Sequence, residues 1–245
     1  MDFKNRTAFV TGASVGIGRA TALKFAGLGA NLVLMDLNRE NAESLLDELK
    51  NYDIDVMFAQ GDISDEECIN KIVKEALERF GRIDILVNNA ALWRSFGDFL
   101  EISVETWKRI IDVNIMGTVY PIRAILPSML ENNYGRIINV TSVAGVYGNA
   151  KMVHYSTTKG AINTLTKALA KEVSDKNILV NSICPGSVSP SDNFDVNYTQ
   201  PSELSFMGRT GSDMENANLI AFLASDEASY IAGQNIQIDG CRKKQ

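Results

Sequence analysis

The segment Tyr155-Ser156-Thr157-Thr158-Lys159 places a phenol and an ammonium four residues apart. On a helix, residues with this spacing lie on the same face. A phenol has a pKa of about 10 and is a poor base at neutral pH, but a nearby ammonium favours its phenolate form. The spacing indicates a pair suited to moving a proton, although an isolated pair of this kind also occurs on ordinary helix surfaces.

A glycine-rich segment, Thr11-Gly12-Ala13-Ser14-Val15-Gly16-Ile17-Gly18, follows an apolar run near the N-terminus and precedes a helical pattern. There the backbone N–H groups can approach a pyrophosphate, and the helix N-terminus places a positive dipole end beside it. Gly12 permits a tight turn, Gly16 a close approach, and Gly18 close packing of helix on strand. The strand–turn–helix context favours a dinucleotide site over a purely structural turn.

The next apolar run ends at Asp36, 18 residues after Gly18. In a dinucleotide-binding fold, a carboxylate here accepts hydrogen bonds from the adenine ribose hydroxyls and repels a 2′-phosphate. The neighbours Val15 and Leu37 carry no positive charge, whereas Arg39 is close enough in sequence to receive such a phosphate. Unless Asp36 only ends a strand or forms a turn, the sequence predicts NAD(H) as the cofactor.

These segments lie in a chain where short apolar runs alternate with longer stretches of helical spacing. Pro121 and Pro127 are expected to bend or break the longest helix. The runs predict strands at Thr7–Thr11, Asn31–Asp36, Asp55–Ala59, Ile83–Val87, Arg136–Val140, Ile178–Ile183 and Asn235–Ile238. The stretches predict helices at Ile17–Leu28, Glu40–Asn51, Glu66–Phe80, Val104–Glu131, Tyr155–Ser174 and Met214–Ala224.

This alternation predicts an α/β fold: a single-domain, Rossmann-type, doubly wound, seven-stranded parallel sheet with helices on both faces. The apolar runs are continuous, as expected for strands covered on both sides. No linker marks a second domain, so we expect residues 1–245 to form one dinucleotide-binding and catalytic domain. The polar stretch at 187–206 is long enough to be a functional, substrate-binding loop.

Taken together, these segments resemble the short-chain dehydrogenase/reductase family, and the resemblance covers essentially the whole chain. Any one motif could arise by chance, but all of them in one order are specific. The chain is similar to NAD-preferring members, to hydroxysteroid dehydrogenases and to 3-oxoacyl carrier-protein reductases. The matching positions are 11–18, Asp36, Asp62, Asn88-Asn89-Ala90-Ala91, Asn114, Ser142, 155–159 and Pro185-Gly186.

The resemblance implies four catalytic residues, Asn114, Ser142, Tyr155 and Lys159. Tyr155 would be the general acid/base at the substrate oxygen, and Ser142 would hydrogen-bond that oxygen as charge develops on it. Lys159 would supply the ammonium and hold the nicotinamide ribose. Asn114 would bend its helix and bind, through its backbone, a water in the proton relay to Lys159.

The resemblance also implies how NAD would be bound. Asp62 would hydrogen-bond the adenine amino group, or else cap the helix after Ser64. Asn88, Ala90 and Ala91 would line the adenosine half. The implied cofactor-binding residues are Gly12, Ser14, Gly16, Ile17, Gly18, Asp36, Leu37, Asp62, Ile63, Asn88, Ala90, Tyr155, Lys159, Pro185, Gly186 and Val188.

Three positions depart from the family pattern. Ala91 replaces a usual glycine, which is tolerable if its φ stays negative. Cys241 stands where a second glycine often follows Asp239-Gly240. Pro190 stands where a threonine often grips the nicotinamide amide, and it has neither a hydroxyl nor an N–H. The groups that could replace that threonine are Ser187, Ser189, Ser191 and the backbone of Val188.

The resemblance implies hydride transfer between NAD(H) and a secondary alcohol or ketone. The expected pocket walls are apolar with polar edges, which suits a bulky substrate such as a hydroxysteroid or bile acid. A 3-oxoacyl thioester is the alternative, although that type mostly uses the phosphorylated cofactor. The wall candidates, which could equally belong to the core or an interface, are Leu92, Trp93, Phe96, Val146, Tyr147, Met152, Phe194, Tyr198 and Phe206.

Composition excludes several other functions. Thirty acidic residues against 24 basic ones give a net charge of −6, which argues against nucleic-acid and membrane-surface binding. No run approaches the roughly 20 apolar residues of a membrane span, and residues 1–6 lack a signal-peptide core. Scattered Cys68, Cys184 and Cys241 and a single histidine, His154, exclude a Cys/His zinc site. We therefore expect a cytoplasmic protein without a metal.

His154 directly precedes Tyr155 but would lie on a different helix face. It is expected to line the pocket or an interface, or to do neither.

The helices at 104–131 and 155–174 carry more apolar residues than a single stripe facing the sheet needs. With the resemblance, this implies a homotetramer or at least a dimer, unless Pro121 and Pro127 rotate the stripe onto the sheet.

Two other functional classes stay open. A methyltransferase also uses a glycine turn on such a sheet, but it has no need of Ser142, Tyr155 and Lys159 together. A catalytically silent NAD-binding scaffold is the other, because a fold does not fix a function.

Overall fold

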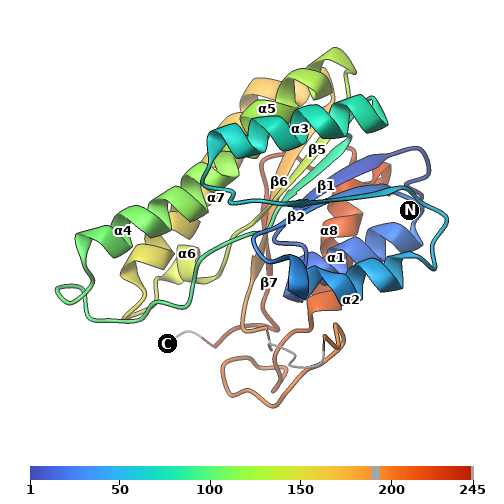
Figure 1. Ribbon diagram of the computed structural model, residues 1–245. Helices are drawn as coiled ribbons and strands as arrows, with labels where there is room; N and C mark the ends of the chain where they lie inside the picture. Colours follow the sequence, from blue (N-terminus) through green and yellow to red (C-terminus); the bar gives the residue numbers. More distant parts are fainter. Residues whose placement is uncertain (189–193, 244–245) are drawn as a thin grey trace.

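The computed structural model describes residues 1–188 and 194–243. Seven parallel strands form one sheet in the order β3-β2-β1-β4-β5-β6-β7, with helices on both faces (Figure 1). The predicted doubly wound α/β fold is confirmed. The strands are β1 (Thr7–Thr11), β2 (Asn31–Asp36), β3 (Val56–Gln60), β4 (Ile85–Asn88), β5 (Gly135–Val140), β6 (Ile178–Pro185) and β7 (Asn235–Ile238).

The helices follow the predicted stretches to within a few residues, except in two places. A short helix after β5 was not predicted, and the long helix at 104–131 is divided. The helices are α1 (Gly16–Gly27), α2 (Arg39–Leu49), α3 (Glu66–Phe80), α4 (Val104–Ile111), α5 (Gly117–Glu131), α6 (Ala144–Tyr147), α7 (Val153–Val173) and α8 (Asp213–Ala224).

Alternate residues of the strands feed two separate cores, one on each face of the sheet. Val10 and Leu34 face the layer of α1, α2 and α8, where they meet Phe25 and Ile220. Phe9 and its neighbours on the other face meet α3, α5 and α7. Because both faces of the central strands are buried, these strands are mostly apolar, as the continuous runs indicated, and their few buried polar residues include Asn139 and Asn181.

Pro121 and Pro127 were expected to bend or break the long helix, and the break does not occur at either proline. A π-helical turn at Asp112–Met116 separates α4 from α5, and α5 then runs through both prolines to Glu131. The helix widens where the Asn114 side chain is hydrogen-bonded to groups outside it. Such π-turns frequently occur at functional sites.

The carboxyl ends of the strands gather the candidate residues at one edge of the sheet. The glycine turn follows β1, Asp36 ends β2 and Ser142 follows β5. From β1 the chain builds outwards to β2 and β3, then returns to add β4 on the other side of β1. Ligands of such sheets bind at the carboxyl edge beside this reversal.

Candidate active site

Tyr155, Lys159 and Ser142 come together where α7 passes the end of β5. The Tyr155 hydroxyl is hydrogen-bonded with Ser142. The Lys159 Nζ donates to the Val140 carbonyl oxygen at 2.7 Å and lies 5.8 Å from the centre of the Tyr155 ring. A phenol, a hydroxyl and a buried ammonium therefore lie close together.

Burial dominates the protonation of both titratable groups. It raises the pKa of Tyr155, a rise that the Ser142 hydrogen bond partly offsets and that nearby Cys184 reinforces. It lowers the pKa of Lys159 to about 8. The pKa of Tyr155 is shifted by burial in the direction opposite to the one expected from a nearby ammonium, and the Lys159 Nζ is directed at the Val140 carbonyl. Tyr155 stands here as a neutral phenol, ready to donate its proton.

Asn114, in the π-turn, joins the loop after β4 to α7. Its Oδ1 accepts from the Leu92 N–H at 2.7 Å, and its Nδ2 donates to the Leu92 carbonyl and to the Thr158 Oγ1, both at 3.0 Å. Thr158 in turn donates to the Tyr155 carbonyl. The Asn114 carbonyl accepts from the Thr118 hydroxyl at 2.9 Å, and its binding of a relay water stays a prediction.

The glycine turn is packed so tightly that two of its residues must be glycine. Gly12 has a φ of +62°, and a Cβ on Gly18 would lie 2.0 Å from the Gly12 carbonyl oxygen. The Asn89 side chain locks the turn by donating to the Thr11 and Gly12 carbonyls at 3.1 and 2.9 Å. Asn89 was missed as a candidate residue, because only its neighbours Asn88 and Ala90 were selected from this segment.

The start of α1 offers open backbone donors. Its N-cap residue, Val15, has no side-chain acceptor for the first-turn N–H groups, whereas side chains cap α2, α3, α4 and α8. Gly16 has a φ of +57°, and the one atom that a Cβ there would approach within 4 Å is the Asp213 Oδ1, at 3.6 Å. A helix start with free N–H groups and open space suits an anion.

Asp36 is tied to this turn. Its Oδ2 accepts from the Ser14 N–H at 3.0 Å, and its Oδ1 accepts from the Asn38 N–H at 3.2 Å. The carboxylate is half-buried and keeps acceptor capacity on both oxygens. Arg39 begins α2 with its guanidinium over the ring of Phe58, 5.5 Å from its centre.

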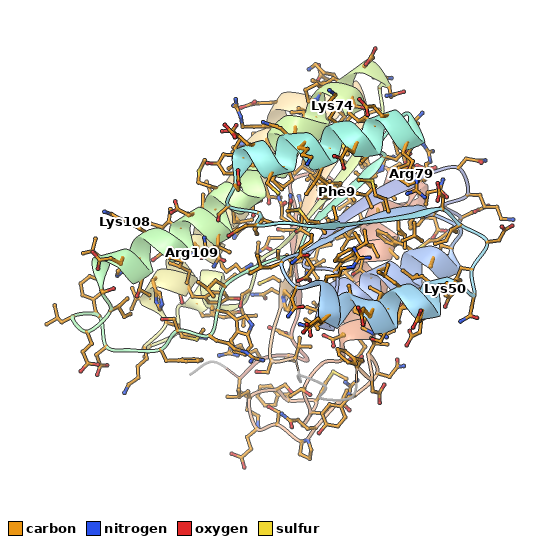
Figure 2. The ribbon with its side chains drawn as sticks, in the orientation of Figure 1. Phe9, Lys50, Lys74, Arg79, Lys108 and Arg109 are labelled. Atoms are coloured by element: carbon orange, nitrogen blue, oxygen red, sulfur yellow. The ribbon has the colours of Figure 1, made fainter. Side chains whose placement is uncertain are left out.

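Asp62 does not cap α3, because that role belongs to Asp65, whose side chain accepts from the Glu67 and Cys68 N–H groups. Instead Asp62 accepts from the backbone N–H and the hydroxyl of Ser64 and is ion-paired with Arg109 of α4, labelled in Figure 2. Next to it, the Ile63 side chain packs against Gly117, where a Cβ would lie 2.7 Å away. Arg109 had no signal in the sequence, because its partner is 47 residues away.

Asn88 lies deeper than its predicted place beside the adenosine. Its Nδ2 donates to Asn139 at 2.9 Å inside the sheet, and Asn139 donates onward to Thr166. The Ala90 N–H is bound to the Thr11 hydroxyl at 3.1 Å. The segment therefore braces the glycine turn through its backbone and through Asn89.

Comparison with known proteins agrees with this geometry. The family model for short chain dehydrogenases matches residues 6–200. The chain belongs to the short-chain dehydrogenase family. It is 36% identical to the 3-oxoacyl-[acyl-carrier-protein] reductase of Thermotoga maritima over 243 residues, 98% of each chain. It is also 36% identical to the corresponding reductase of Aquifex aeolicus over 244 residues, 97% of each.

Solved structures of the same family superpose closely. An NAD⁺-bound xylitol dehydrogenase has a TM-score of 0.90 and 31% identity, covering 98% of this chain and 100% of its own. The chain is thus an oxidoreductase that acts on the CH–OH or keto group of a small molecule. None of these relatives is named for a hydroxysteroid, so the comparisons do not support that finer expectation.

The departures from the family pattern have small structural consequences where the structure describes them. Ala91 is absent from the residues with positive φ, so its methyl group is accommodated. Cys241 adopts a φ of +59°, a conformation usually left to glycine. Gly186 donates its N–H to the Ile238 carbonyl and packs on Asp239. Pro190, Ser189 and Ser191 lie outside the described residues.

Several of the residues predicted to line the substrate pocket have exposed apolar side chains. These side chains are all at least one-third exposed: Trp93 and Phe96 after β4, Tyr147 at the end of α6, and Phe194, Tyr198 and Phe206 on the predicted substrate loop. His154 is fully buried beside the Trp107 ring, and burial lowers its pKa. It is therefore a neutral packing residue rather than a pocket or surface group of the free chain.

No helix in the described residues is long and apolar enough to cross a membrane. The same residues hold no group of three or more His, Cys, Asp or Glu side chains that could hold a metal ion.

Proposed function

We propose that this chain is an NAD(H)-dependent oxidoreductase that interconverts a secondary alcohol and a ketone on a partly apolar substrate. The observation that carries this proposal is that Ser142, Tyr155 and Lys159 come together at the same edge of the sheet as the glycine turn. A catalytically silent scaffold does not require these three side chains to lie together. A methyltransferase does not require a phenol close to a buried ammonium.

Each of the three side chains has a role that its surroundings support. As the neutral phenol, Tyr155 donates its proton to the carbonyl oxygen during reduction, and as the phenolate it takes the hydroxyl proton during oxidation. Ser142 donates a hydrogen bond to the same oxygen and stabilises its developing charge. Lys159 holds the nicotinamide ribose, and Asn114 fixes the π-turn and binds the relay water. When bound, the nicotinamide ring supplies or accepts the hydride.

The residues present suit a dinucleotide. The uncapped start of α1 receives the pyrophosphate, and the open space at Gly16 admits it. Asp36 would accept hydrogen bonds from the adenine ribose hydroxyls, and Asp62, two residues after the end of β3, would accept one from the adenine amino group. Beside them we assign to the cofactor site Gly12, Ser14, Ile17, Gly18, Leu37, Ile63, Asn88, Ala90, Pro185, Gly186 and Val188.

Asp36 makes the cofactor NAD(H) rather than its 2′-phosphorylated form. A carboxylate held by Ser14 and Asn38 cannot turn away from an incoming phosphate, and charge repulsion follows. The test compares kcat/KM for the two cofactors. Wild type should have the higher kcat/KM with NAD(H). Asp36→Ala should weaken the binding of NAD(H) and reduce the difference in kcat/KM between the two cofactors. A wild type that prefers the phosphorylated cofactor would contradict this assignment and point to Arg39.

The substrate is tested with a panel of alcohols and ketones, followed by absorbance of the reduced cofactor. The exposed aromatic side chains around the site favour bulky, partly apolar compounds over small polyols. A second candidate, a 3-oxoacyl thioester, is favoured by the two reductases that match the full length of the chain. The panel therefore includes 3-oxoacyl thioesters, hydroxysteroids and xylitol, and absence of turnover with every member would favour the silent scaffold.

The remaining features of the proposal concern the molecule as a whole. We assign residues 1–245 to one domain, supported by a sheet whose strands run from Thr7 to Ile238, and residues 187–206 to substrate binding. We place the protein in the cytoplasm, which the free thiols of Cys68, Cys184 and Cys241 support. Apolar side chains of α5 and α7 that stay partly exposed support a homotetramer, or at least a dimer.

A further inference from the structure

Asp62, Ser64 and Arg109 form a hydrogen-bonded cluster at the carboxyl edge of the sheet. The Arg109 Nη2 donates to the Asp62 Oδ2 at 2.9 Å, and the Arg109 Nη1 donates to the Ser64 Oγ at 2.8 Å. Ser64 donates to the Asp62 Oδ1 from its hydroxyl at 2.7 Å and from its backbone at 2.9 Å. The carboxylate is therefore held from both ends and cannot rotate freely.

The Asp62 carboxylate keeps one hydrogen-bond acceptor site that the cluster does not fill. Each carboxylate oxygen can accept two hydrogen bonds. The Oδ1 of Asp62 already accepts two, whereas the Oδ2 accepts one, from Arg109. Burial raises the pKa of Asp62, but the bonds from Ser64 and Arg109 outweigh it and hold the pKa below its ordinary value. The open site is thus on an ionised oxygen, which can accept a hydrogen bond but cannot donate one.

The sheet register places this oxygen next to the residue assigned to the ribose. Gln60 pairs with Asp36 across β2 and β3, and the Gly61 N–H donates to the Asp36 carbonyl. Asp62 is the next residue of the chain, so Asp36 at the end of β2 and Asp62 just after the end of β3 lie at the same edge of the sheet. A nucleoside whose ribose meets Asp36 would present its base near Asp62.

We propose that Arg109 is a positioning residue for adenine recognition: it holds the Asp62 carboxylate so that the free acceptor site on the Oδ2 receives the adenine 6-amino group. This inference rests on the proposed NAD(H) function and deepens it. Arg109 itself touches the carboxylate and not the base. An ionised carboxylate selects a donor, so hypoxanthine, which carries an oxygen in place of that amino group, is rejected.

The test measures discrimination between NAD and nicotinamide hypoxanthine dinucleotide. Wild type should prefer NAD in kcat/KM by about 10- to 100-fold, the range expected for one hydrogen bond to a charged group. Asp62→Ala should abolish the preference. Arg109→Gln should remove most of it by raising KM for NAD, with kcat unchanged because the change is distant from the reacting carbon. Arg109→Lys, which retains one charge-assisted contact, should restore part of it.

A matched control lies on the same helix. Lys108 is exposed, and the described part of the chain offers its side chain no carboxylate partner, so Lys108→Gln removes the same charge without touching Asp62 (Figure 2). Its discrimination ratio should equal that of wild type. Because the Arg109 side chain is half-exposed, its loss should leave the melting temperature nearly unchanged.

A second measurement is independent of turnover. Calorimetric binding of adenosine monophosphate should be tighter than that of inosine monophosphate in wild type, and the two should bind alike in Arg109→Gln. If Arg109→Gln weakens both ligands equally, Arg109 is merely structural and the proposal is overturned while the NAD(H) function stands. If wild type binds and turns over neither dinucleotide, the proposed function itself fails.

Discussion

Tyr155 is the side chain on which the proposed chemistry depends most directly. Tyr155→Phe keeps the ring and removes the proton donor, so turnover should fall by about 100-fold or more. Binding of NAD, measured by calorimetry, should change little. Near-normal turnover at neutral pH would eliminate Tyr155 as the acid/base.

The pH dependence of Tyr155 follows from its raised pKa. Oxidation needs the phenolate, so its rate should increase as the pH rises towards that pKa, whereas reduction needs the phenol and should not share the increase. The Tyr155→Phe variant should lose this dependence. An oxidation rate in wild type that falls over the same alkaline range would contradict the assignment.

Substitutions at two glycines of the turn after β1 should affect stability and NAD binding differently. A Cβ on Gly18 would overlap the Gly12 carbonyl, so Gly18→Ala should lower both the melting temperature and NAD affinity. Gly16 has open space and a φ of +57°, so Gly16→Ala should cost about 1–2 kcal/mol of stability. That variant should stay folded by circular dichroism yet lose NAD affinity, because its methyl group occupies the phosphate cradle. Equal losses in both variants would contradict this distinction.

The sequence allowed prediction of side chains whose role is local. Tyr155 and Lys159 share a helix face, and the glycines of the turn are explained by positive φ and close packing, all within a few residues. It did not allow prediction of Asn89 and Arg109, which act through partners 77 and 47 residues away. The pKa of Tyr155 was misjudged for the same reason, since burial depends on the whole fold.

Helix α8 begins with a buried carboxyl group, Asp213, whose ionisation lowers the stability of the folded protein. Asp213 is 6% exposed, and burial raises the pKa of its carboxyl to about 6. Because the folded pKa exceeds the unfolded value of 3.8, the native state is relatively more stable below about pH 4. That stability is lost as the pH rises through about 6. Asp213→Asn should therefore stabilise the protein at pH 8 by up to about 3 kcal/mol.

The same variant provides its own control. At pH 4 the wild-type carboxyl is protonated in the folded protein, so the two proteins should melt at nearly the same temperature. The measurement is thermal unfolding of both proteins at pH 4 and pH 8. A stabilisation of equal size at both pH values would show that packing, not charge, is responsible.

The division between α4 and α5 shows where pattern-based prediction of elements fails. Proline was expected to bend or break the helix because it lacks an N–H and clashes with the preceding turn. The π-turn occurs instead at Asn114, whose side chain satisfies groups of the β4 loop and of α7. Strand and helix identities were predictable from apolar periodicity, whereas this turn depends on three segments distant in sequence.

The whole molecule is expected to assemble with copies of itself. Leu126, Leu165 and Leu169 pack on the core from α5 and α7 but remain partly exposed, and Ile111 and Leu130 are more than one-third exposed. Covering them against another subunit removes apolar surface from water. Light scattering at micromolar concentration should give a mass two or four times 26.9 kDa. A mass near the single-chain value would contradict the prediction of an oligomer.

The strand order has a consequence for the growing chain on the ribosome. Each strand, taken in the order of synthesis, joins an outer edge of the sheet already made, and none inserts between two earlier strands. Assembly can therefore proceed while translation continues. The part of α1 that packs against α8 nevertheless stays uncovered until α8 (Asp213–Ala224) emerges. A nascent chain stalled before residue 213 would expose that part of α1 to chaperones, and release of the last thirty or so residues would cover it.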